Sequence, residues 1–227
     1  MQPAGGYLFL LGLAGGLAIL PLTAYARVTP GWVRWLLMAA GIFTAGRYVA
    51  LAYIMMFAGG PVEIGQLWFG STVGLTLPSV FAVDALVRHP AMTPKKLLLR
   101  FSPFLAAYAA LLLFARGDVI VYRIAQGSTV IPDRVFLLAP VWRMFAFVVQ
   151  ALFVIGFVGL CLLLVKKIPV QAIQSALLIL AAAHSYLGVV GLLLATRGWW
   201  FTAPFLAPEM LVLLALWYAF QIADSLR

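Results

Sequence analysis

The sequence has few charged residues: only 9% of its 227 residues are Asp, Glu, Lys or Arg, whereas 65% are hydrophobic. Soluble domains carry about a quarter charged residues, so the charges present here are too few to cover the surface of a soluble fold of this length. This composition excludes an ordinary soluble domain, a disordered chain and a nucleic-acid-binding module. It indicates an integral membrane protein built as one compact bundle.

Residues that carry metal and redox chemistry are equally scarce. One cysteine, Cys161, and two histidines, His89 and His184, leave no disulfide framework, no CxxC metal motif and too few histidines for bis-histidine haem ligation. The hydrophobic stretches also lack paired carboxylates and a GxSG motif, and the seventh has no lysine for a retinal Schiff base. We therefore predict no catalytic residues and no metal site, and the residues indicate no particular cofactor.

Long hydrophobic stretches, in contrast, are abundant. A membrane-spanning helix needs about 20 mostly apolar residues, and seven stretches qualify, separated by Gly, Pro and charged residues. They are Ala4–Tyr25, Trp32–Ala58, Gln66–Val87, Leu97–Ala115, Phe136–Val165, Val170–Thr196 and Pro204–Asp224. No basic residue precedes the first stretch, which favours a permanent helix over a cleaved signal peptide. We predict an all-α fold, a single seven-helix transmembrane domain over residues 1–227.

The basic residues predict how the bundle is oriented. The chain has 15 Lys and Arg against 6 Asp and Glu, a net charge of +9, and cytoplasmic loops are enriched in Lys and Arg. With the N-terminus outside, nine basic residues lie inside, namely Arg27, Arg34, Arg88, Lys95, Lys96, Arg100, Lys166, Lys167 and Arg227. Only four lie outside, namely Arg116, Arg123, Arg134 and Arg197. We predict a cytoplasmic C-terminus in a bacterial inner membrane, with anionic lipid headgroups rather than nucleic acid as the partner of the basic residues.

One long outer connection, residues 116–135, joins the fourth and fifth stretches. The β-favouring runs 119–122 and 129–132 flank Gln126, Gly127 and Ser128, which predicts a short β-hairpin cap. A structural lid and a contact for a ligand or partner both fit this segment, because long loops in compact domains are often functional.

Small residues recur at helical spacing within the stretches. Gly12 and Gly16 lie four residues apart, as do Gly70 and Gly74. This spacing lets another helix backbone approach closely. We predict that these glycines pack helices within the bundle, and a homodimer contact is the alternative.

Two ionisable residues lie midway along predicted helices. An ionisable group inside a span costs roughly 2.5–3.5 kcal/mol on insertion scales and marks a site. Arg47 and His184 lie at similar depths, about 16 and 18 Å from the outer ends of their helices at helical rise. We predict that they share an outward-accessible ligand pocket; as the alternative, Thr44 and backbone carbonyls satisfy Arg47, and His184 packs without a ligand. The aromatic residues expected to line the pocket are Tyr48, Tyr53, Tyr186 and Trp217.

Arg143 and Glu209 lie in the outer parts of the fifth and seventh stretches. An ion pair between them across the bundle would add both residues to the ligand site. In the simpler interpretation Arg143 extends outward beside Trp142, and Glu209 follows Pro208 at the start of a helix, where the helix dipole favours a carboxylate.

These features favour a non-catalytic function. A seven-helix bundle with an outer loop is typical of a ligand-sensing, receptor-like module or of a subunit of a larger membrane complex. The first alternative is a small-solute transporter or channel that uses a midplane site around Arg47 and His184. The second is a membrane-embedded enzyme acting on a lipid. The expected partners are a small-molecule ligand and other membrane subunits or a second copy of the chain.

Overall fold

The computed structural model describes residues 3–56, 64–88, 93–115, 117–126, 129–196 and 206–227. Within them the chain forms seven helices and one hairpin, and each helix falls on one of the seven hydrophobic stretches. The helices are α1 (Pro3–Val28), α2 (Gly31–Met56), α3 (Ile64–Val87), α4 (Pro94–Phe114), α5 (Pro140–Lys167), α6 (Gln171–Thr196) and α7 (Leu206–Ser225). Four of them, α1, α5, α6 and α7, contain segments long and apolar enough to cross a membrane, as expected for a membrane protein.

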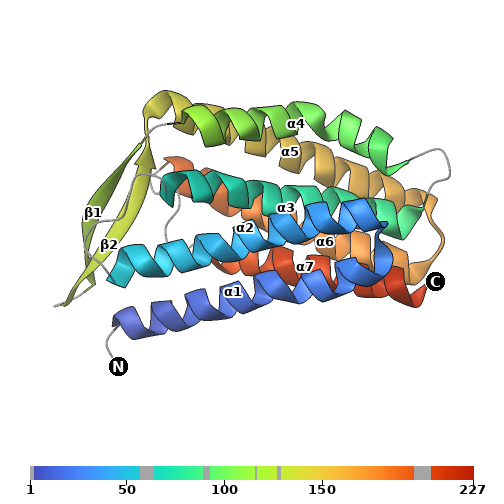
Figure 1. Cartoon of the computed structure of the whole chain (residues 1–227), viewed down its shortest axis with the longest axis horizontal. Helices are drawn as coiled ribbons and strands as arrows, with labels where there is room; N and C mark the ends of the chain where they lie inside the picture. Colours follow the sequence, from blue (N-terminus) through green and yellow to red (C-terminus); the bar gives the residue numbers. More distant parts are fainter. Residues whose placement is uncertain (1–2, 57–63, 89–92, 116, 127–128, 197–205) are drawn as a thin grey trace.

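The helices run side by side along the long axis of the molecule, with the N-terminus and the hairpin at one end and the C-terminus at the other (Figure 1). Helix α1 packs against α2 and α7, and α3 packs against α2, α4 and α7. Helix α6 packs against α5 and α7. Both α1 and α3 therefore contact α2 and α7, so these four helices surround a common interior.

The hairpin consists of β1 (Gly117–Gln126) and β2 (Thr129–Leu138), which pair antiparallel with Gly117 opposite Leu138. It lies in the predicted connection but extends further along the chain. The prediction that the fifth helix starts at Phe136 is wrong, because Phe136 pairs with Val119 in the hairpin and α5 begins at Pro140. Proline suits the first helical position, where its missing N–H is not needed, and this explains the later start.

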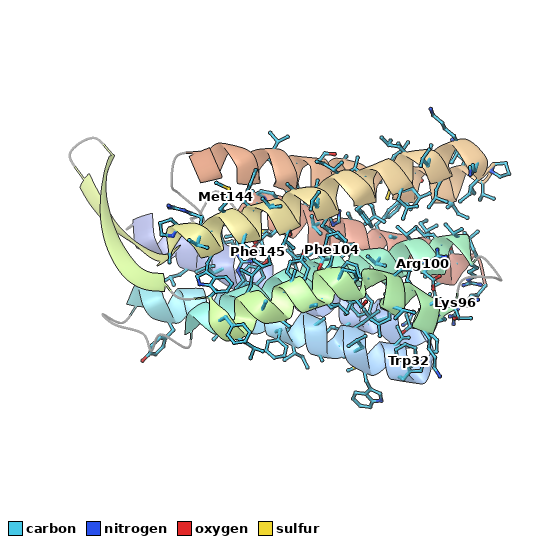
Figure 2. All side chains as sticks on the ribbon, turned by 90° about the horizontal axis from the view of Figure 1, so that it is seen from above. Trp32, Lys96, Arg100, Phe104, Met144 and Phe145 are labelled. Carbon is cyan, nitrogen blue, oxygen red and sulfur yellow. The ribbon has the colours of Figure 1, made fainter. Side chains whose placement is uncertain are left out.

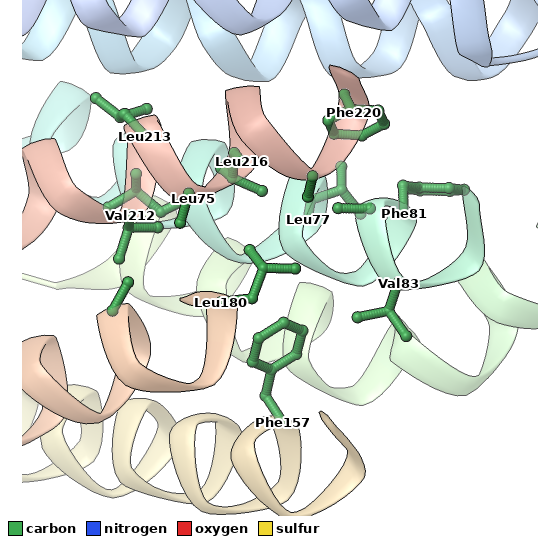
Figure 3. Packing of buried hydrophobic residues seen from close by; sticks show 14 of the residues in the cluster. Leu75, Leu77, Phe81, Val83, Phe157, Leu180, Val212, Leu213, Leu216 and Phe220 are labelled. Carbon is green, nitrogen blue, oxygen red and sulfur yellow. The ribbon is translucent and has the colours of Figure 1, made fainter. Parts of the chain in front are cut away.

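The hydrophobic core contains buried side chains from all seven helices, and Figure 3 shows the part of it between α3, α5, α6 and α7. Phe81, Phe157, Leu180 and Phe220 are all almost completely buried. Among the residues whose burial is described, α7 contributes most, with ten buried residues among its 20, so half of this helix lies in the interior. Its buried alanines recur every four residues, at Ala215, Ala219 and Ala223, and such small side chains let neighbouring backbones approach.

The glycines divide into two groups. A Cβ on Gly188 of α6 would lie 3.0 Å from Val154 Cγ1 of α5, so these helices pack closely there. At Gly12 and Gly16 an added Cβ meets nothing within 4 Å, and both residues lie on the outside of the bundle. The prediction that this pair packs helices within the bundle is therefore wrong. The structure does not describe the surroundings of the other pair, Gly70 and Gly74.

Arginines join the helices at the end of the bundle that holds the C-terminus, where the nine predicted inner basic residues gather. We call it the basic end. Arg27 Nη1 lies 3.8 Å from Asp224 Oδ2, and Arg88 Nη2 donates to the Ala223 carbonyl oxygen at 2.9 Å. Arg227 donates to the last two carbonyl groups of α1. The end of α7 is thus attached to the ends of α1 and α3 by guanidinium groups that bind helix C-terminal carbonyls, the arrangement that the helix dipole favours.

Candidate functional site

A buried ion pair connects α2 and α7. The Arg47 Nη1 atom lies 2.6 Å from Glu209 Oε1, and only 4% of the arginine side chain and 5% of the glutamate side chain are exposed. Because α1 and α3 pack against both α2 and α7, the pair lies in the interior that these four helices surround. Both charged side chains are therefore removed from bulk solvent and face each other.

Tyr48 also binds this glutamate. Its hydroxyl donates to Glu209 Oε2 at 3.1 Å, so the arginine and the tyrosine, which are neighbours on α2, bind different oxygens of one carboxylate. Tyr48 is also almost completely buried. We call Arg47, Tyr48 and Glu209 the charged cluster.

The place of Glu209 in its helix explains why a carboxylate is accommodated. It is the fourth residue of α7 and the only acid in its first turn, where the partial positive charge of the helix start favours an anion. The possible ion pair between Glu209 and Arg143 is not formed, because Glu209 binds Arg47 instead. The simpler interpretation of Glu209 agrees with its place in the first turn of α7. The long Arg47 side chain reaches Glu209 although the two residues lie at different depths along their helices. Arg143 is partly exposed in the first turn of α5.

His184 belongs to a second polar cluster, between α3 and α6. Its ring is completely buried. The Nδ1 atom lies 2.9 Å from the Leu180 carbonyl oxygen of the preceding turn, and Nε2 lies 3.0 Å from Ser79 Oγ on α3. Because a carbonyl only accepts hydrogen bonds, Nδ1 carries a proton. We call Ser79 and His184 the histidine cluster.

The Ser79 hydroxyl has one proton to donate and lies within hydrogen-bond distance of two atoms that could accept it, the Leu75 carbonyl oxygen and His184 Nε2. Its hydroxyl donates to the Leu75 carbonyl at 2.6 Å. While it does so, its oxygen can only accept from His184 Nε2, and the ring then carries a proton on each nitrogen. If the ring is neutral, the serine proton turns to Nε2 instead. The cluster therefore has two hydrogen-bonded arrangements that differ by one proton.

Two aromatic rings of α5 lie beside the histidine. The ring centres of Phe157 and Phe153 on α5 lie 4.5 and 6.0 Å from that of His184. Phe153 in turn contacts Phe101 and Phe104 of α4 at 5.8 and 5.9 Å. This row of rings connects α4 through α5 to the histidine and keeps the cluster in apolar surroundings.

Sequence reasoning missed Ser79 as the partner of His184. The available signal was Pro78, which has no N–H for the helix and leaves polar groups to be satisfied by a neighbouring serine. It also missed the phenylalanines of α5, because phenylalanine is common in any hydrophobic helix.

The other predicted site residues lie in different surroundings. Tyr48 is next to Arg47 in the charged cluster, and Trp217 is half-buried on α7. Tyr186 and Tyr53 are on the outside of the bundle, 45% and 41% exposed, and their place in an outward-accessible pocket with Arg47 and His184 stays a prediction. Arg47 and His184 bind different partners, and a ligand pocket shared by the two stays a prediction.

Comparison with known proteins adds no family. No known protein family matches the sequence, and no curated protein is significantly similar to it.

Proposed function

We propose that this chain is a ligand-sensing, receptor-like membrane module in which the charged cluster responds to a small molecule. The observation that carries the proposal is the buried ion pair between Arg47 and Glu209. Removing two charges from water costs several kcal/mol per ion, and the attraction between them often does no more than offset this cost. A bundle that needed only stability would be served as well by apolar residues at both positions.

The charged cluster is placed to affect the far end of the molecule. Helix α7 carries Glu209 in its first turn and Ala223 and Asp224 in its last. At the basic end, Ala223 contacts Arg88 and Asp224 contacts Arg27. A ligand that competes for Arg47 or Glu209 releases α7 from α2, and a shift of this helix changes the contacts at its other end.

We further propose that all seven helices cross a bacterial inner membrane, with the N-terminus outside and the basic end facing the cytoplasm. The positive-inside rule supports this orientation, since nine basic residues lie at that end. The test uses a Cys161→Ala background with single cysteines at Thr129 in β2 or Ser225 in α7. An impermeant maleimide should label Thr129→Cys in intact cells and Ser225→Cys only after permeabilisation. The reverse pattern would overturn the orientation.

The receptor proposal is tested by what the purified chain retains. The full chain is extracted gently from its membrane and compared with the Arg47→Met/Glu209→Met double variant by native mass spectrometry. A small molecule bound to the unsubstituted chain and missing from the double variant would support the proposal. A matched control, Ser102→Ala, which removes an exposed hydroxyl outside both clusters, should retain the molecule.

Two other results would point to the alternative functions. Other membrane chains that co-purify at fixed stoichiometry with both forms would indicate a complex subunit instead of a receptor. Solute flux into liposomes that depends on Arg47 would indicate a transporter. Either result without a ligand that depends on the charged cluster would refute the receptor proposal.

A further inference from the structure

Three exposed cations lie on the first two turns of α4. Lys95, Lys96 and Arg100 are all exposed, and the first turn of α4 contains no acid. Figure 2 shows Lys96 and Arg100 at the same end of the molecule as Trp32. Lysine and arginine beside exposed tryptophan are typical of the membrane–water interface.

Beyond these cations the outer face of α4 is apolar and exposed. The helix buries Phe101, Tyr108 and Leu111 against the bundle. Its other side exposes Leu99, Leu113 and Phe114, with exposed fractions of 63–73%. The surface thus has cations at one end and apolar side chains along its length. A phospholipid has the matching order, a phosphate at the interface and acyl chains below it.

The helix dipole distinguishes α4 from the other lysine pair at the basic end. Lys166 and Lys167 end α5, where the partial negative charge of the helix C-terminus favours cations. Lys95 and Lys96 begin α4, where the partial positive charge disfavours them. An external anion therefore stabilises the α4 lysines more than the α5 lysines.

We propose that this α4 surface, formed by Lys95, Lys96, Arg100 and the apolar residues below them, binds a phospholipid with an anionic headgroup. The inference depends on the membrane placement proposed above and not on the receptor function. It goes beyond a general attraction of the basic end to anionic lipid, because it assigns the binding to one helix.

The two lysine pairs provide a matched test. The variants Lys95→Gln/Lys96→Gln and Lys166→Gln/Lys167→Gln lose the same charge at the same end, and both are compared with the full chain. Each protein is titrated in neutral detergent with phosphatidylglycerol, with phosphatidylcholine and with inorganic phosphate. Native mass spectrometry measures the retained lipid, and the melting midpoint measures the stability. Phosphatidylglycerol should bind the full chain and the α5 variant alike and the α4 variant on the order of thirty-fold more weakly. Without anionic lipid, the α4 variant should melt no lower than the full chain.

Several results would overturn the proposal. Equal losses in both variants would mean a diffuse surface potential rather than a site on α4. Equal stabilisation by inorganic phosphate would mean a free-anion site, and equal retention of phosphatidylcholine would mean that the charge is irrelevant. Arg100→Gln, a single change, serves as the second variant if the double variant fails to fold. A chain that fails to float with vesicles would refute the membrane placement itself, whereas loss of ligand sensing in Arg47→Met/Glu209→Met leaves this lipid binding intact.

Discussion

The charged cluster and the histidine cluster bury polar groups between helices in two different ways. In the charged cluster, Arg47 and Glu209 each come from a different helix, and full charges compensate one another at 2.6 Å. In the histidine cluster, His184 binds a carbonyl of its own helix at 2.9 Å and a serine hydroxyl of α3 at 3.0 Å. The first cluster depends on another helix for charge balance, and the second depends on another helix for a single hydrogen bond.

This difference predicts how each cluster responds to substitution. Removing one member of a buried ion pair leaves an uncompensated charge, which is far more costly than an unsatisfied neutral group. The charged cluster should therefore behave as an all-or-none connection between α2 and α7. The histidine cluster should tolerate changes more gradually, because part of its hydrogen bonding is local.

The largest expected effect is the loss of one charge from the charged cluster. Among the described residues, Arg47→Met leaves the buried Glu209 with Tyr48 as its partner, and we expect the free energy of unfolding to fall by about 3–5 kcal/mol. The double variant Arg47→Met/Glu209→Met removes both charges and should lose much less than the single variant. Denaturation midpoints in detergent measure both.

A double-mutant cycle sharpens this prediction. The coupling between Arg47 and Glu209 should account for most of the single-variant loss. If each single substitution cost under about 1 kcal/mol, the ion pair would resemble an exposed salt bridge, and the contrast between the two clusters would disappear.

Much of the helical architecture was predictable from the sequence. The seven hydrophobic stretches predicted the helices because apolar length is a strong local signal. The start of α5 at Pro140 was missed because Phe136 to Leu138 are apolar in either a helix or a strand. Only pairing with β1 distinguishes the two, and that pairing depends on residues distant in the sequence.

The site was predictable in its members but not in its pairings. Arg47, Glu209 and His184 stood out because ionisable residues inside hydrophobic stretches are rare. Depth along each helix suggested Arg143 as a possible partner of Glu209, and the structure pairs Glu209 with Arg47. Depth gives no information on helix rotation or on which helices are neighbours, and these decide which side chains meet.

The next effect in size concerns the histidine cluster. Ser79→Ala removes the partner of His184 Nε2, and we expect a loss of about 1–3 kcal/mol, the cost of leaving a buried polar group unsatisfied. Ser102→Ala is the matched control, since its hydroxyl makes a comparable bond to a backbone carbonyl at 2.7 Å but is exposed. Its loss should stay within about 0.5 kcal/mol. Equal losses in the two variants would mean that Ser79 matters only to its own helix.

The smallest expected effect tests whether the two clusters are independent. Gly188 lies one turn after His184, and a Cβ there would lie 3.0 Å from Val154 Cγ1. Gly188→Ala therefore shifts α6 slightly from α5, at a cost of about 1 kcal/mol after the gain in helix propensity, whereas Gly16→Ala on the open face of α1 should stabilise by about 0.5–1 kcal/mol through helix propensity alone. The shift moves His184 relative to Ser79, so Gly188→Ala and Ser79→Ala should combine less than additively.

The same glycine substitution should add fully to Arg47→Met, because the charged cluster connects α2 to α7 without using α6. Non-additivity with Arg47→Met would show instead that the two clusters form one network through α7, which packs against α6 as well as against α1 and α3.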